Sequence, residues 1–319
     1  MARDSWDFAY ELLTLDPNNH SAGLLQACVW GRLGFSSRAF ESLNRIPVAR
    51  QDVDYWIVRA HCLQDSKQDE SAIEAWRHAL PMLSEKPDGV SRKLGAARLA
   101  FRNCLLRLGR TIEAGVVNCE RLNIPRRDST TPAHLVDLSL SYSSSLGSPT
   151  RFLSKEEMPE DWPTGVRDFG GVSFDVRGVV SGSSPWLGTG KPQPAAVGVK
   201  GAFVHFLHST TYENSGQDGL TIASYVIHFA DRTKASVPVV YGQDVRGWSG
   251  AMDSLPPSRA PITWTGSNAI SRKFNHQFRL FKMSWKNPKP EVVIDRIEFD
   301  YGPVGGPLLF TLGISAQNE

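Results

Sequence analysis

The 319-residue sequence predicts a multidomain protein in which an N-terminal α-solenoid precedes an all-β domain, an antiparallel β-sandwich or jelly roll. Two observations predict this fold class. Before Ser129, Ala, Leu and Arg recur at helical spacing. After it, short β-branched and aromatic runs are separated by Gly, Pro and Asn. We therefore expect a helical repeat domain over residues 1–128, a linker leading into the sandwich over 129–165, and the β-sandwich over 166–319.

A repeated pair of small residues marks the helical part. Gly34 is followed five residues later by Ala39, and Gly109 is followed five residues later by Ala114. Ala72 occupies the equivalent small position between these two copies. Small residues let two helices approach closely, and glycine permits the turn between them. The spacing therefore predicts stacked helical pairs.

This pattern resembles the tetratricopeptide repeat (TPR), which has a period of ~34 residues. The match is incomplete because Lys67 stands where the second copy needs its glycine, and an unrelated helical bundle is the alternative. The resemblance implies that the first helix of each repeat lines a groove for a protein partner. The groove residues that it implies are Arg32, Ile57, His61, Asp65, Leu99, Asn103 and Arg107.

Charge is uneven within the helical part, although the whole chain carries a net charge of only +2. Residues 52–74 contain six acidic and two basic side chains, whereas residues 92–127 contain nine basic and two acidic ones. The arginines either form a solvated helix face or dock an acidic segment of a partner. Apart from Phe101, no aromatic side chains that stack on bases interleave them, so we do not expect a nucleic-acid partner.

The second half contains eight runs with the features of β-strands. They are short, rich in β-branched and aromatic residues, and bounded by turn residues. Eight strands without intervening helices imply a sandwich or jelly roll. The runs cover residues 172–180, 202–208, 222–230, 236–241, 261–265, 278–285, 292–299 and 308–314.

An ordered series of segments in this half resembles an uncharacterised C-terminal β-sandwich module of bacterial multidomain proteins. That module occurs beside repeat arrays or Ser/Thr kinase modules. The resemblance covers about residues 132–319 and implies a jelly roll of the galactose-binding type, with no activity attached. This chain departs from the pattern at Arg232, where a turn glycine is expected. The segments include VRDFGGVSFDVRGVV at 166–180, SYVIHFAD at 224–231, VPVVYGQDVRGW at 237–248 and LFKMSWKNPKP at 280–290.

One turn of the β part combines aromatic rings with charged groups. Tyr241, Asp244, Arg246 and Trp248 lie within eight residues of one another. Sugar-binding sites need such pairings, because rings stack on the apolar faces of a sugar while charged groups hold its hydroxyls. These four residues are therefore candidate ligand-binding residues, with carbohydrate as the candidate ligand. The alternative is that Tyr241 and Trp248 pack in the core.

Signatures of catalysis, metal binding and membrane insertion are missing from the sequence. There is no nucleophile elbow and no complete phosphate loop. His205 and His208 are three residues apart in one expected strand, so they point to opposite faces. No apolar stretch approaches the ~20 residues of a membrane span, and no signal-peptide pattern is visible. We therefore expect no enzyme, no metal, no cofactor and a cytoplasmic location.

Together these expectations describe a non-catalytic binding or scaffold protein. The helical groove is expected to hold a protein partner, with an acidic segment as the candidate. The β-sandwich is expected to bind a ligand, with carbohydrate as the candidate, or to dock another domain. The alternative is a regulatory C-terminal fragment of a Ser/Thr kinase-type signalling protein.

Overall fold

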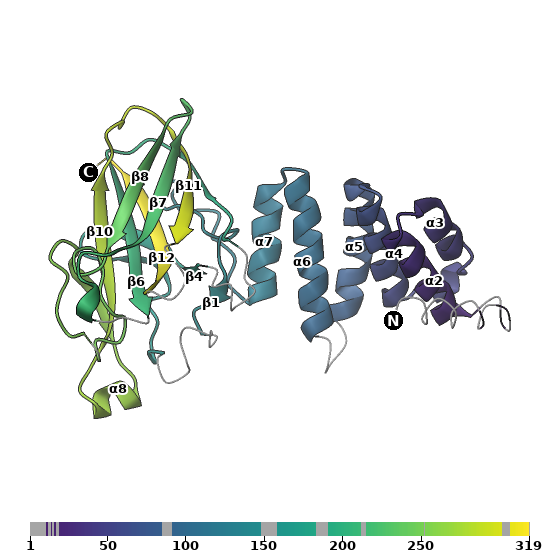
Figure 1. The fold of residues 1–319 in the computed structure, drawn as a ribbon, viewed down its shortest axis with the longest axis horizontal. Helices are drawn as coiled ribbons and strands as arrows, with labels where there is room; N and C mark the ends of the chain where they lie inside the picture. The colour runs from purple at the N-terminus through teal and green to yellow at the C-terminus, as the bar shows by residue number, and fades with distance from the viewer. Residues whose placement is uncertain are drawn as a thin grey trace. The chain divides into compact units, whose positions relative to one another are not determined.

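The computed structural model describes residues 11, 14, 16, 19–84, 91–147, 158–182, 191–211, 215–251, 253–301 and 307–318. The chain divides into two compact units, which we call the helical unit (up to Arg121) and the β unit (from Leu122). The predicted division into an N-terminal helical part and a C-terminal part of antiparallel strands is confirmed (Figure 1). Each unit is described by itself.

The described helices of the helical unit follow one another along the chain, and three of their connections are turns of three residues. Helix α2 packs against α3 and α4, and α5 packs against α4 and α6. The small residues Ala39, Ala72 and Ala114 are fully buried, as close helix packing requires. The helices are α2 (His20–Arg32), α3 (Ser36–Asn44), α4 (Val53–Asp65), α5 (Asp69–Ser84), α6 (Ser91–Arg107) and α7 (Thr111–Leu122).

Three inter-helix turns share one conformation. Gly34, Lys67 and Gly109 follow α2, α4 and α6, and their φ angles are 81°, 59° and 71°. In each turn this residue donates its N–H to the carbonyl three residues back, and the next residue donates to the carbonyl five residues back, at 2.8–3.1 Å. This pattern is the Schellman motif that ends many helices. Lys67 therefore adopts the left-handed conformation that glycine occupies in the other two turns.

Replacing Lys67 by glycine should raise the free energy of unfolding of the helical unit by about 0.5–1 kcal/mol. Relief of the left-handed strain is worth about 1–2 kcal/mol, and the greater freedom of glycine in the unfolded chain offsets part of it. Conversely, Gly109→Ala should lower stability, although its added Cβ would contact no atom within 4 Å. Urea unfolding monitored by circular dichroism measures both changes. Gly95→Ala, within α6, is the control and should not destabilise.

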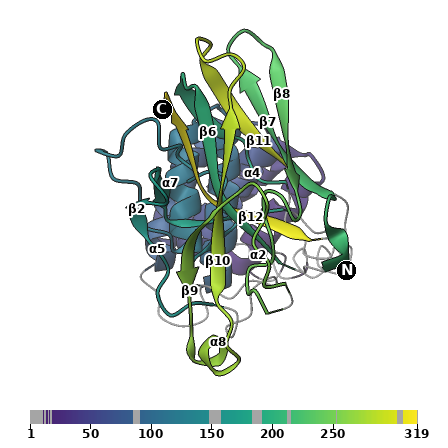
Figure 2. The ribbon, with the colours of Figure 1, turned by 90° about the vertical axis from the view of Figure 1, so that its left-hand side faces the viewer.

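The β unit contains three antiparallel sheets in its described residues. The six-stranded sheet has the order β1 (Ser144–Ser145), β4 (Gly178–Ser181), β12 (Leu308–Gln317), β6 (Phe203–Thr211), β10 (Phe278–Lys286) and β9 (Ile262–Gly266). The four-stranded sheet has the order β5 (Ala195–Val199), β11 (Ile294–Tyr301), β7 (Thr221–Phe229) and β8 (Lys234–Val240). The third sheet is the hairpin of β2 (Gly165–Asp168) and β3 (Ser173–Val176). Helix α8 (Ala269–Lys273) lies between β9 and β10 in the chain (Figure 2).

The predicted fold class, an α-solenoid followed by an all-β sandwich or jelly roll, is wrong. The described β unit has a third sheet and a short helix, which that class does not contain. The physical reason is visible in β6, where residues 204–211 are buried without alternation. Phe206 stacks on Tyr225 of the four-stranded sheet, whereas Leu207 packs with Phe174 of the hairpin. A strand that is covered on both faces needs a third layer.

The side chains that cover the second face of β6 form a cluster that we call the outer core. It joins residues of the hairpin, of the six-stranded sheet and of the segment before β2. The rings of Trp162 and Trp264 stack on Trp248, with centroids 5.2 and 6.0 Å away. The buried members of the outer core are Leu146, Phe169, Val172, Phe174, Val176, Val179, Leu207, Trp248, Phe278, Leu280, Phe310 and Leu312.

Part of the predicted linker, residues 129–165, lies on the six-stranded sheet. Val136 donates its N–H to the carbonyl of Ile314 at 2.9 Å, and Ser143 donates to the carbonyl of Val179 at 2.8 Å. Residues 144–145 form β1. Residues 148–157 of the predicted linker lie outside the described part of the chain.

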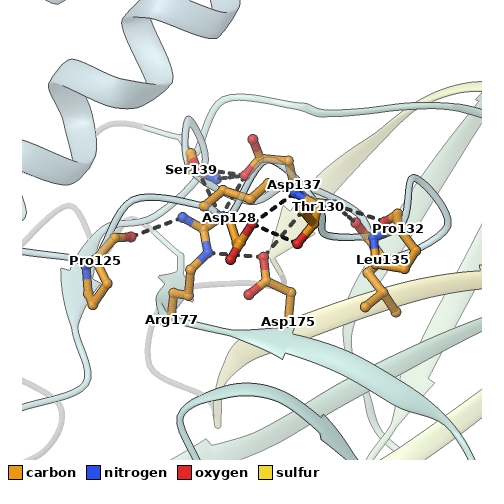
Figure 3. A network of polar contacts seen from close by, with 10 residues as sticks. Pro125, Asp128, Thr130, Pro132, Leu135, Asp137, Ser139, Asp175 and Arg177 are labelled. Carbon is orange, nitrogen blue, oxygen red and sulfur yellow. Dashed lines mark hydrogen bonds and ion pairs between the residues drawn. The ribbon is translucent and has the colours of Figure 1, made fainter.

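A buried ionic network holds the first part of the predicted linker, residues 129–165, in place (Figure 3). The predicted strand 172–180 is in fact two strands, β3 and β4, which belong to different sheets and meet at Arg177. The Arg177 guanidinium donates to Asp175 at 3.0 Å, to Asp137 at 2.7 Å and to the carbonyl of Pro125 at 3.1 Å. One side chain therefore joins three stretches of chain at the point where the chain changes sheets.

Candidate functional site

The seven predicted groove residues lie on three helices, and we call the surface that they form the inner face. Arg32 is the last residue of α2. The other six form one row on α4 and one on α6, because residues four apart lie on the same side of a helix. Ile57 is half-buried, and the other six are exposed. The rows are Ile57, His61 and Asp65 on α4, and Leu99, Asn103 and Arg107 on α6.

Two hydrogen bonds connect the helices α4 and α6, which carry six of these residues. The Gln64 amide joins α4 to α6, because it donates to the carbonyl of Ala100 at 3.2 Å and to Cys104 Sγ at 2.8 Å. At the C-terminal ends of α2 and α4, partial burial lowers the pKa of His61, Asp65 opposes this shift, and Arg32 adds to it. Arg32 and Asp65 therefore both act electrostatically on His61.

The acidic and basic stretches of the helical unit are paired with each other. Arg107 holds Asp69 through two hydrogen bonds of 2.8 and 2.6 Å, which lower the pKa of that carboxyl group. The ion pairs Lys93–Asp54 and Arg110–Glu70 join the same two stretches at 3.5 and 3.3 Å. Several cations of the 92–127 stretch are thus neutralised within the unit. No ion pair to Arg32 is found among the described residues, and its side chain is exposed.

The two aromatic residues of the predicted sugar-binding turn are buried. Tyr241 is 0% exposed and donates its hydroxyl to Asp253 Oδ2 at 2.8 Å, and Trp248 is 1% exposed in the outer core. Arg246 is also buried, and it pairs with Asp253 at 2.6 Å. Protein atoms therefore cover these rings, and the turn presents no open aromatic face for a sugar.

Asp244, the fourth residue of that turn, lines a pocket of about 250 Å³. Its buried carboxylate accepts two hydrogen bonds from Arg259, at 3.1 and 2.6 Å, and one from the N–H of Val240 at 2.9 Å. Sequence reasoning missed Arg259 and Trp285, which line the pocket with Asp244. These residues come from separate segments, and no local motif connects them. The full lining is Val237, Pro238, Asp244, Arg259, Ala260, Pro261, Lys282, Met283, Ser284 and Trp285.

The histidines of the sheets make separate contacts. His205 Nδ1 lies 2.8 Å from Ser284 Oγ, and burial followed by the charge of Lys282 lowers its pKa. His208 is fully buried and contacts Tyr225. Within the residues that the structure describes, no three His, Cys, Asp or Glu side chains converge as a metal site requires.

None of the described helices is both long enough and apolar enough to cross a bilayer. Among known proteins, no family model matches the chain and no curated protein matches its sequence.

Proposed function

We propose that this protein is a non-catalytic binding protein whose helical unit binds a segment of a partner protein on the inner face. The observation that carries the proposal is the exposure of six of its seven side chains across α2, α4 and α6. They include both charges, an imidazole and an apolar group, and interfaces combine such groups. Leu99 is 41% exposed, so its side chain is accessible to an apolar group of a partner.

The partner segment should carry an acidic side chain opposite Arg32. A carboxylate gains most from a cation that has no other partner, and Arg32 fits that description among the described residues. Arg107 is a weaker attachment point, because a ligand carboxylate would have to displace Asp69 from a two-bond contact. The same partner should place an apolar side chain on Leu99.

Charge reversal at Arg32 should weaken binding of the partner segment by about 10–150-fold. Loss of one charge-assisted hydrogen bond costs about 1.5–3 kcal/mol, and the new carboxylate adds repulsion. The measurement selects peptides from a displayed random library on the full chain, then compares their affinity for the wild type and for Arg32→Glu. We expect selected peptides to be enriched in Asp and Glu.

The matched control is Arg45→Glu, the same change at an exposed residue just after α3, away from the inner face. It should leave peptide affinity unchanged, and both variants should keep the melting temperature of the wild type. Selected peptides that bind Arg32→Glu as tightly as the wild type would rule out the inner face as the binding surface.

A further inference from the structure

The pocket around Asp244 lies at an open edge of β10. Strand β9 pairs with β10 only as far as Ile262, after which the N–H of Lys282 donates to the carbonyl of Pro261 at 3.2 Å. In an antiparallel strand, alternate residues direct both backbone groups to the same side. Ser284 therefore directs its N–H and carbonyl to the same edge of β10 as Lys282 does. Strand β9 does not extend along this edge as far as Ser284, and no other described strand covers it there. The pocket thus gains a backbone donor and a backbone acceptor.

The charged groups that line the pocket are Asp244, Arg259 and Lys282, and they leave one net positive charge and spare hydrogen-bonding capacity. Asp244 and Arg259 neutralise each other, and Arg259 uses only two of its five N–H donors on Asp244. The Arg259 side chain remains 57% exposed, so its other donors are open to a ligand. The ammonium of Lys282 is bonded to the carbonyl of Gly170, and the hydroxyl of Ser284 to His205. The donors of Arg259 that remain open match the hydroxyl oxygens of a ligand with several hydroxyl groups.

The remaining lining is apolar and ring-rich. The half-buried Trp285 and the exposed Pro238 and Pro261 line the pocket together with the buried Val237 and Met283. Its volume of about 250 Å³ lies below the ~300–1,000 Å³ of pockets for drug-sized ligands. A single ring with one apolar face and several hydroxyl groups matches both the size and the chemistry.

We propose that this pocket binds a neutral hexose unit of a glycan. The C–H face of the sugar packs on Trp285, as sugars do on aromatic rings. The hydroxyls accept hydrogen bonds from Arg259 and donate to the carbonyl of Ser284. This site is distinct from the inner face, and its occupancy does not depend on peptide binding by the helical unit.

The test measures binding of methyl glucoside, methyl galactoside and methyl mannoside to the full chain. Saturation-transfer NMR detects the binding. At least one hexoside should bind in the millimolar range, as expected for a ligand of this size. Trp285→Leu and Arg259→Lys should each weaken that binding about tenfold, since each removes one type of contact. Phe274→Leu is the matched control, because Phe274 is 66% exposed on the β unit and does not line the pocket.

Three results would overturn the proposal. They are no binding of any of the three hexosides, equal affinity in Trp285→Leu and Arg259→Lys, and tighter binding of glucuronate or glucosamine than of the neutral sugars. If Trp285→Leu lowers the melting temperature, Arg259→Lys decides, because it keeps the positive charge beside Asp244 and removes only the planar fork. The peptide selection on the inner face is a separate measurement, so failure of one proposal leaves the other standing.

Discussion

Replacing Arg177 by methionine is expected to lower the free energy of unfolding of the β unit by about 3–5 kcal/mol. The side chains of Arg177 and Asp175 are only 5% and 4% exposed. Removing the cation leaves a buried carboxylate without its closest partner, and a loss of this size is typical for one partner of a buried ion pair. Arg127, 3.3 Å from Asp175, limits the loss but cannot replace the Arg177 contacts to Asp137 and Pro125.

Urea unfolding of the full chain measures this loss. Arg167→Met is the control, because Arg167 is exposed on β2 and its guanidinium donates to the carbonyl of Thr164 at 2.9 Å. It should change stability by about 0.5 kcal/mol or less. A double variant, Arg177→Met with Asp175→Leu, should recover part of the loss because the buried carboxylate is removed together with its closest partner. A loss below about 1 kcal/mol for Arg177→Met alone would show that the network contributes little.

The same network predicts how the chain is cleaved. Arg127 donates to the carbonyls of Leu135 and Pro132 at 2.6 and 3.0 Å, so it is held in the same cluster as Arg177. Because Arg177 anchors Pro125, its loss should free the chain around Arg126 and Arg127. Trypsin should therefore cut there faster in Arg177→Met than in Arg167→Met.

The β unit should lose about 2 kcal/mol of stability between pH 7 and pH 5 through His208 alone. This histidine is fully buried, and desolvation lowers its pKa to about 4, against 6.5 for the exposed group. Between these two pKa values, His208 is protonated in the unfolded chain and neutral in the folded chain. Stability is complete above pH 6.5 and falls as the pH drops towards 4, by about 3 kcal/mol over the whole range.

The contacts of His208 explain why the neutral form is kept. Its Nε2 lies 3.1 Å from the carbonyl of Asp244, which can only accept, so Nε2 carries the proton. Nδ1 then accepts from the hydroxyl of Tyr225 at 3.0 Å, and that oxygen accepts from Thr311 at 2.8 Å. Every member of the chain of hydrogen bonds is satisfied without a charge. A second proton on His208 would require the Tyr225 hydroxyl hydrogen to turn away from Nδ1.

Unfolding free energies at pH 7, 6 and 5 test this prediction. The His208→Gln variant should be less stable at pH 7 and should lose most of the slope between pH 7 and pH 5. The control is His205→Gln, which leaves the chain of hydrogen bonds from His208 to Thr311 intact and should keep the His208 part of the slope. An unchanged slope in His208→Gln would assign the pH dependence to other groups.

The sequence by itself determined the features that depend on neighbours in the chain. Helical spacing before Ser129 and short β-branched runs after it predicted the order of helices and strands. Gly34 and Gly109 predicted two of the inter-helix turns, because a left-handed residue favours glycine. The third turn, at Lys67, has the same geometry despite the missing glycine, since the helices on either side hold it.

Only the tertiary structure decided which strands face which layer. An apolar run such as that of β6 predicts a buried strand, but it does not say whether one face or both are covered. The hairpin β2–β3 covers the second face, and that pairing is set by contacts between distant segments. For the same reason the sequence predicted a two-layer sandwich where the protein builds three sheets.

The candidate sites divide in the same way. Helical periodicity was enough to align Ile57 with His61 and Asp65, because residues four apart share a side of a helix. Two ion pairs, Arg107–Asp69 and Asp244–Arg259, join residues that are distant in the sequence. No local sequence pattern therefore predicts them. Nor does an aromatic ring reveal from sequence whether it fills a core, as Trp248 does, or lines a pocket, as Trp285 does. Both uses require the same apolar surface, and only the fold determines whether that surface is covered by protein or left for a ligand.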